Sequence, residues 1–205
     1  EEEERAAIFN GLYPHDEQIT DTLFTTRRPN IITIVLEGMS AELIEELGGM
    51  KGVTPNFNRL AREGVLFTNC HANSFRTDRG LICALSGYPS FPKTSVMKST
   101  TKSQKLPSLA SALANEGYTN TFVYGGDINF TNQSSYMYAT GWEELYWQNE
   151  MSFDAPTSKW GYDDRVVCRD LTERVIRMSE EGRPFLAGWL TLSSHEPFEV
   201  PFEKF

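Results

Sequence analysis

The sequence has no long apolar run and no signal-peptide pattern. No apolar stretch approaches the ~18 residues of a membrane-spanning helix. The chain opens with Glu1 to Glu4 followed by Arg5, the reverse of the basic and then apolar plan of a secretory signal. We therefore expect no direct information on cellular location from these residues.

Cysteine and positive charge are also scarce. Cys70, Cys83 and Cys168 are odd in number and scattered, without the spacing of a zinc site or a disulfide framework, so we expect buried single thiols. The net charge is −9, and no basic stripe is present to meet phosphate groups, which argues against nucleic acid as a partner.

Length and composition suit one soluble globular domain. A chain of 205 residues can bury a core, and 40% hydrophobic and 23% charged residues are ordinary values for such a domain. We expect residues 29–205 to form the domain and residues 1–28 to be a lead-in segment on its surface. Its candidate anchors are Ile8, Phe9, Leu12 and Tyr13.

The clearest pattern is a strand that ends on an acid. Five of the six residues from Ile31 to Leu36 are large and apolar, which predicts a strand buried on both faces. Glu37 and Gly38 follow it. Ligands of open α/β sheets gather beyond the carboxyl ends of the strands, so Glu37 is a candidate metal ligand or catalytic group.

Strand and helix patterns then alternate, which predicts an α/β fold with a mostly parallel central sheet flanked by helices. Residues 88–105 hold prolines, serines and lysines and predict an exposed excursion. The further strands expected are 65–67, 118–124 and 184–192, and the helices expected are 41–47, 54–64, one beginning near Thr77, 107–117, 134–140 and 163–182.

Polar residues follow three of these strands. Glu37, Asp127 and His195 would meet at one edge of a parallel sheet, and the loop with Thr77 would start there too. A hydroxyl at a helix start beside a carboxylate and a divalent cation is a workable nucleophile, although threonine needs such help. Spacing alone leaves open whether Thr77 or Asp78 merely caps the helix.

Several motifs resemble, in order, the alkaline phosphatase and sulfatase superfamily in its lipoteichoic acid synthase-like branch. The resemblance runs from about Arg28 to Phe205. Its motifs are residues 31–40 (IITIVLEGMS), 54–57 (TPNF), 60–65 (LAREGV), 74–80 (SFRTDRG), 124–127 (YGGD), 160–164 (WGYDD) and 190–198 (LTLSSHEPF).

The resemblance implies a role for each candidate residue. Glu37 would bind a divalent metal ion, with manganese preferred and magnesium, zinc or calcium as alternatives. Thr77 would be metal ligand and covalent nucleophile, and His195 would hydrogen-bond the bound oxyanion. Asp127 would line the substrate pocket. Arg79 would steady an anionic group, with a packing role equally open.

The resemblance also implies a substrate class and a location. A metal-dependent hydrolase or phosphotransferase would act on phosphate esters or phosphodiesters, with an anionic small molecule, lipid head group or glycan as substrate. The domain would lie at the extracytoplasmic face of a bacterial cell membrane, with a membrane anchor upstream.

Three departures from the family qualify this picture. Thr77 stands where sulfatases carry a modified Cys or Ser, which favours phosphoryl chemistry. Gly125, Thr131 and Gln133 stand near positions where synthase relatives carry His, Trp and Arg, which indicates a different phosphodiester or phospholipid donor. The family's Asp-His metal pair has no counterpart here. We therefore expect the N-terminal portion of a larger domain, with weak metal binding and poor turnover on its own.

Two alternatives remain open. The first is true sulfuric ester hydrolysis. The second is a non-catalytic module that binds an extracellular anion or glycan through the aromatic region from Trp142 to Trp160. A Rossmann-type nucleotide site is set aside because no Gly-x-Gly-x-x-Gly turn follows the first strand.

Overall fold

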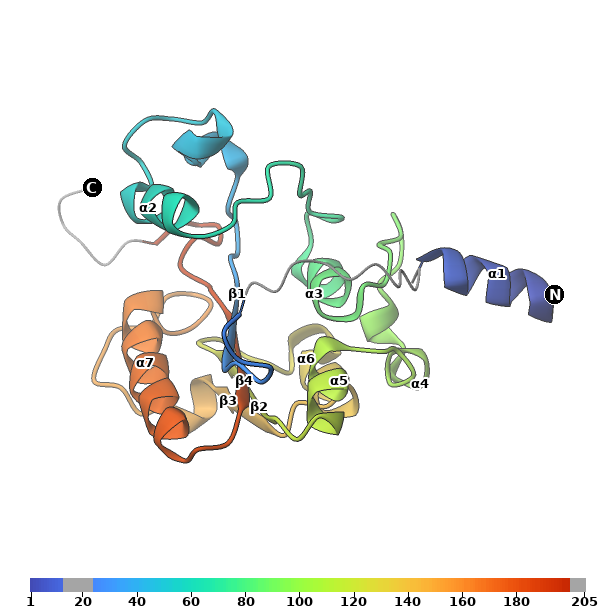
Figure 1. Ribbon diagram of the computed structural model, residues 1–205. Helices are drawn as coiled ribbons and strands as arrows, with labels where there is room; N and C mark the ends of the chain where they lie inside the picture. The colour runs from blue at the N-terminus through green and yellow to red at the C-terminus, as the bar shows by residue number, and fades with distance from the viewer. Residues whose placement is uncertain (13–23, 200–205) are drawn as a thin grey trace.

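The computed structural model describes residues 1–12 and 24–199 and has a parallel sheet at its centre (Figure 1). The strands β1 (Ile31–Val35), β2 (Thr119–Tyr124), β3 (Glu144–Trp147) and β4 (Phe185–Leu190) lie in the order β1-β4-β2-β3. All three neighbouring pairs are parallel. The helices are α1 (Glu2–Leu12), α2 (Pro55–Glu63), α3 (Thr77–Ser86), α4 (Thr100–Ser103), α5 (Leu109–Asn115), α6 (Gln133–Ala139) and α7 (Asp164–Glu180). The predicted α/β class is confirmed.

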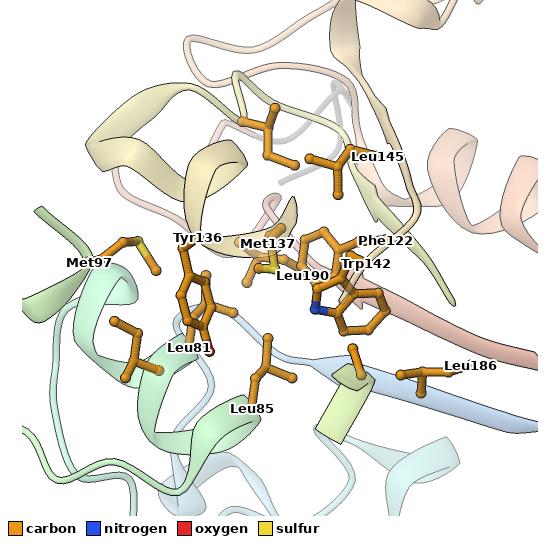
Figure 2. Packing of buried hydrophobic residues seen from close by; sticks show 13 residues of the cluster. Leu81, Leu85, Met97, Phe122, Tyr136, Met137, Trp142, Leu145, Leu186 and Leu190 are labelled. Atoms are coloured by element: carbon orange, nitrogen blue, oxygen red, sulfur yellow. The ribbon is translucent and has the colours of Figure 1, made fainter. Parts of the chain in front are cut away.

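Helices cover both faces of the sheet, with α7 on one face and α3, α5 and α6 on the other (Figure 1). The α7 face is closed by Val167 and Leu171, which pack against the β2 and β4 side chains. The opposite face holds the larger cluster, shown in Figure 2, in which Phe122 packs edge-on to Trp142 with their ring centroids 5.1 Å apart. β4 is buried along its whole length, as its unbroken apolar run requires.

Two strand predictions are wrong. β1 is not buried on both faces, because Ile32 and Ile34 are about half exposed, at 49% and 50%. Among the described residues, β1 pairs with β4 alone. Residues 65–67 form no strand, and Val65 and Phe67 are exposed. The fourth strand is instead β3, a short segment whose sequence has no clear alternation of apolar and polar residues.

Several local expectations also fail. Residues 41–47 form two short 3-10 turns, separated by the extended backbone of Ile44. The 88–105 excursion is not simply exposed, because Met97 is fully buried in the larger core cluster. Cys70 and Cys168 are exposed and Cys83 is half-buried, so the thiols are not uniformly buried.

The described part of the lead-in segment holds the helix α1. Ile8 and Phe9, two of the candidate anchors, are more than half exposed, at 59% and 51%. Tyr13 lies outside the described residues. No helix within the described ranges has the length and apolar content to cross a bilayer.

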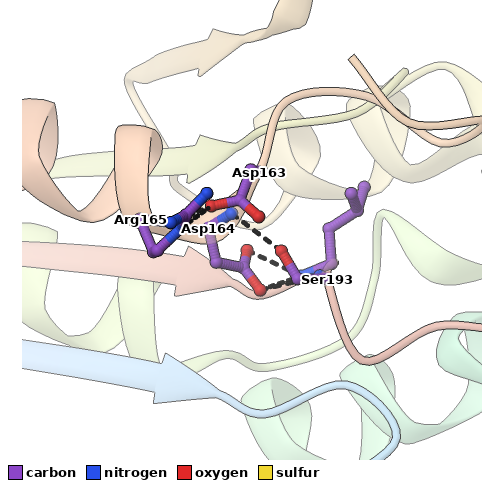
Figure 3. A network of polar contacts seen from close by, with 5 residues as sticks. Asp163, Asp164, Arg165 and Ser193 are labelled. Atoms are coloured by element: carbon purple, nitrogen blue, oxygen red, sulfur yellow. Dashed lines mark hydrogen bonds and ion pairs between the residues drawn. The ribbon is translucent and has the colours of Figure 1, made fainter. Parts of the chain in front are cut away.

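A half-buried carboxylate, that of Asp164, ties α7 to the end of β4 (Figure 3). The Asp164 side chain accepts hydrogen bonds from the backbone N–H groups of Leu192, at 2.8 and 3.0 Å, and of Ser193, at 2.7 Å. The Asp164 N–H donates to Ser193 Oγ at 2.8 Å. The neighbouring Asp163 instead caps α7, with its carboxylate accepting from Arg165 N. Asp164 therefore fixes the backbone that leads from β4 to His195.

The Asp164 contact predicts a pH-dependent stability. Burial raises the pKa of Asp164, and the hydrogen bonds from Leu192 and Ser193 only partly oppose this. A raised folded-state pKa means that ionisation works against folding. The unfolding free energy of the wild type minus that of Asp164→Asn should therefore fall as the pH rises from below about 3.9, and level off above the folded-state pKa. Urea unfolding at several pH values measures this difference, and a rise with pH would contradict the assignment.

Gly38 predicts a second measurable effect. Its φ is +63°, and a Cβ there would meet the carbonyl oxygen of Ser194. Gly48 is a matched control, with φ +85° and open space around its Cβ position. Gly48→Ala should cost about 1–2 kcal/mol of unfolding free energy for the left-handed backbone alone. Gly38→Ala should cost clearly more, and equal losses for the two would show that the Ser194 contact is unimportant.

Candidate active site

Glu37 is held at the sheet edge by the end of β4. Its backbone N–H donates to Thr191 Oγ1 at 2.8 Å, and the Thr191 N–H donates to the carbonyl of Val35 at 3.0 Å. The close approach of Gly38 to Ser194 continues this contact between the two segments. These contacts hold the ends of β1 and β4 together and so fix the position of the Glu37 carboxylate at the sheet edge.

Thr77 meets Glu37 directly. Thr77 is the first residue of α3, and its Oγ1 donates to Glu37 Oε2 at 2.8 Å across 40 positions of sequence. The N-cap residue is Arg76, and it makes no side-chain capping bond. The Thr77 hydroxyl is thus turned to Glu37, and the positive end of the α3 dipole lies at the same place.

A cleft of about 440 Å³ surrounds this pair. Its lining includes Glu37, Arg76, Thr77, Tyr124, Gln133 and His195. These residues come from the carboxyl ends of β1, β2 and β4 and from the first turns of α3 and α6. The predicted convergence of Glu37, Thr77 and His195 on one place is therefore present in the structure.

His195 is oriented by its neighbours. Its Nδ1 lies 2.8 Å from the carbonyl oxygen of Glu196, which can only accept, so Nδ1 carries a proton. Nε2 is then left to contact a ligand, and it donates a hydrogen bond when the ring is protonated. The indole of Trp160 packs against the imidazole with centroids 4.4 Å apart, and its Nε1 donates to the same carbonyl at 2.7 Å.

Asp127 and Arg79 do not reach the cleft lining. The Asp127 carboxylate accepts from the Asn129 N–H at 2.9 Å and shapes a turn. Arg79 lies in a separate hollow, where its Nη1 donates to the carbonyl of Pro92 at 2.9 Å. Arg76, which the sequence reading did not select, lines the cleft, and its Nε lies 3.4 Å from the buried carboxylate of Asp78. Its position directly before Thr77 in the sequence could have identified it as a cleft residue.

Tyr124 was also missed as a site residue, although it is the last residue of a predicted strand. Burial raises the pKa of its phenol, and the negative charges of Glu37, Asp127 and Asp164 raise it further. The phenol therefore stays protonated and available as a donor at neutral pH. These carboxylates make the sheet edge an acidic environment that would attract a cation.

The donor set fits part of a hard-cation site. A carboxylate and a hydroxyl oxygen, Glu37 Oε2 and Thr77 Oγ1, are the ligand types that divalent magnesium, calcium and manganese prefer. Within the described ranges, no group of three or more His, Cys, Asp or Glu side chains is arranged to hold a metal ion. The pair would thus supply two ligands of a larger coordination sphere.

Comparison with known proteins points to the same family as the sequence motifs. Residues 29–204 match the sequence model of the family described as Sulfatase. Phosphoglycerol transferase I of Xanthomonas campestris is 26% identical over 181 residues, which cover 83% of this chain and 26% of that protein. The Escherichia coli phosphoglycerol transferase I is 25% identical over 154 residues, covering 71% of this chain and 20% of that protein.

Solved structures share the fold. A protein of the alkaline phosphatase superfamily from Vibrio parahaemolyticus has a TM-score of 0.85 at 25% identity, covering 100% of this chain and 52% of that one. The lipoteichoic acid synthase LtaP from Listeria monocytogenes has a TM-score of 0.79 at 17% identity, covering 96% and 48%. The chain therefore spans about a quarter of the curated relatives and about half of these solved structures. It belongs to the sulfatase family, within the alkaline phosphatase superfamily.

Proposed function

We propose that the protein is a metal-dependent phosphotransferase or hydrolase that acts on a phosphate ester or phosphodiester of the cell envelope, with Thr77 as the nucleophile. The observation that carries this proposal is the 2.8 Å contact between Thr77 Oγ1 and Glu37 Oε2 at the start of α3. The names of the relatives, phosphoglycerol transferase and lipoteichoic acid synthase, support phosphoryl transfer and an envelope substrate.

The proposed reaction has two halves. In the first, Thr77 Oγ gives up its proton and bonds to phosphorus while the bond from phosphorus to the leaving oxygen breaks, and the leaving group takes up a proton. In the second, water or an acceptor hydroxyl attacks the phosphothreonine, and Thr77 Oγ leaves and regains a proton. A bound divalent ion would supply charge that lowers the hydroxyl pKa. Manganese is the proposed ion, and a zinc complex of the Escherichia coli EptC periplasmic domain is known among the structural neighbours.

The chain's own groups have separable tasks in this scheme. Glu37 orients Oγ through the observed hydrogen bond. The α3 N-terminus favours the negative charge that gathers on the transferred group. His195 would donate from Nε2 to a phosphoryl oxygen, in the orientation set by Glu196 and Trp160.

The alternatives have weaker support. Of the aromatic region proposed for glycan binding, Trp142 is buried in the core at 1% exposure, and Trp160 packs on His195. A flat sugar platform independent of the cleft is therefore not formed by these two residues. Sulfate-ester hydrolysis lacks its modified nucleophile, because Thr77 holds that position.

We also propose a location. An envelope substrate would place the domain on the outer face of a bacterial cytoplasmic membrane, attached by a segment that precedes Glu1. The periplasmic domain of Escherichia coli EptC shares the fold and supports this placement.

Replacement of Thr77 tests the nucleophile in the full-length protein. With manganese present, Thr77→Ala should lower kcat on an aryl phosphodiester by about a thousandfold or more, because a covalent route has no substitute for its nucleophile. Thr77→Ser should keep part of the activity. Thr172→Ala is the matched control, since the Thr172 hydroxyl donates to the Cys168 carbonyl of its own helix and lies outside the cleft lining.

The same assay includes an aryl sulfate. Wild-type protein should hydrolyse the phosphodiester in preference to the sulfate. Full activity of Thr77→Ala would refute the nucleophile, and a preference for the sulfate would refute the phosphoryl assignment.

A further inference from the structure

Positive charge is concentrated in the segment that follows α3. Residues 79–115 hold five of the 19 basic residues and none of the 28 acidic ones, although the net charge of the chain is −9. Four of the five are lysines of the 88–105 excursion: Lys93, Lys98, Lys102 and Lys105. All four are exposed, and none of them forms an ion pair with a residue that the structure describes. The overall negative charge therefore conceals a basic surface.

Short helical turns hold these lysines on the outside of a fixed segment. The 3-10 turn Val96–Lys98 packs beside both α3 and α4. Between the lysines, Met97 is fully buried at 0% exposure and Ser103 is buried at 1%, so the backbone is anchored from its inner side. Figure 1 shows α4 beyond α5, on the side of the molecule away from α7. The lysines are therefore presented together at one end of the domain.

The excursion is also tied to the first turn of α3. The Ser95 hydroxyl donates to the carbonyl of Asp78 at 3.1 Å, and Arg79 Nη1 donates to the carbonyl of Pro92 at 2.9 Å. Both contacts lie within two residues of Thr77, the first residue of α3. A partner that holds the excursion therefore also sets the orientation of the helix on which the candidate nucleophile lies.

Two features of this surface indicate its partner. A lysine ammonium is a compact, hydrated charge without the fork that matches one phosphate, so exposed lysines suit a surface of many diffuse negative charges. Phe91 is 47% exposed two positions before Lys93, and its ring contacts Tyr88 with centroids 5.9 Å apart. Aromatic rings beside basic residues are typical of surfaces that lie at the head-group level of a bilayer. A soluble polyanion would use the lysines but gain little from the exposed ring.

We propose that Phe91 and the four lysines form a docking surface for a bilayer that contains anionic phospholipids. Each lysine near such a surface favours the docked state by about fivefold. The remainder of the chain holds all 28 acidic residues and is repelled by the same lipids, so this surface selects one orientation of the domain. The proposal extends the proposed envelope location and does not depend on the identity of the nucleophile.

The test measures backbone hydrogen exchange of the full-length protein on two bilayers, phosphatidylcholine alone and phosphatidylcholine with an equal amount of phosphatidylglycerol. The protein is reconstituted into both, or mixed with vesicles of both if it carries no anchor. Exposed amides of residues 91–105 should exchange about fivefold or more slowly on the anionic bilayer. Raising the salt from about 0.1 M to about 1 M shortens the Debye length from about 10 Å to about 3 Å and should remove most of this difference.

Variants separate this surface from the net charge of the chain. The double variant Lys98→Glu, Lys102→Glu should lose the difference between the two bilayers. The matched control, Arg169→Glu with Arg177→Glu, makes the same change of charge at two exposed positions of α7 and should keep it. Phe91→Ser should weaken the difference, because the ring no longer enters the head-group layer. The lysines lie outside the cleft lining, so the lysine variant should keep wild-type kcat on a soluble aryl phosphodiester, which also shows that it is folded.

Equal exchange of the wild type on the two bilayers would overturn the proposal, and so would an equal loss in the lysine and arginine variants. Protection by soluble polyphosphate, without any from phosphatidylglycerol, would assign the surface to a soluble polyanion instead. Equal protection on both bilayers that disappears when Glu1 to Glu4 become glutamine would mean that α1 covers the lysines. Thr77→Ala should keep the wild-type difference, so a failure of the proposed nucleophile is recognised separately in the turnover assay.

Discussion

The hydrogen bond between Thr77 and Glu37 is the contact on which the site depends. It joins the start of α3 to the end of β1 across 40 positions of sequence, and only the parallel sheet brings these two ends together. In the part of the chain that the structure describes, the edge strand β1 pairs with β4 alone, so the position of Glu37 relies on Thr191 and on the close passage of Gly38 beside Ser194. Loss of either support would free the carboxylate.

The rest of the cleft is built outward from this pair by three separate supports. Asp164 holds the backbone between β4 and His195 from the α7 side of the sheet. Trp160 holds the His195 ring through a tilted ring contact and through the Glu196 carbonyl, to which both residues hydrogen-bond. Asp127 accepts a hydrogen bond in the turn that precedes Thr131, a further residue of the cleft lining. Loops held by hydrogen bonds in this way give a preorganised site, which is what electrostatic stabilisation of a transferred phosphoryl group requires.

Much of the candidate site could be predicted from the sequence, because polar residues that directly follow an apolar run mark the carboxyl end of a strand. The apolar run before Glu37 and the run before His195 predicted two strands, and parallel pairing then predicted that these residues and Thr77 converge. The sequence could not show which way a loop side chain turns: Arg79 bonds the Pro92 carbonyl, whereas Arg76 lines the cleft. The order of the strands within the sheet could not be predicted from the sequence either. Ile32 and Ile34 look like core residues, yet both are about half exposed, because the sheet face on which they lie is not covered by described residues at the edge strand β1.

The central claim is that a phosphoryl group passes through Thr77 Oγ, and trapping the intermediate tests it most directly. Full-length protein with manganese and a phosphodiester would be quenched in acid during turnover, digested and analysed by mass spectrometry. The account predicts a phosphoryl-type adduct on the peptide that contains Thr77, localised to that residue and absent from Thr77→Ala. An adduct on another side chain, or none during rapid turnover, would contradict it.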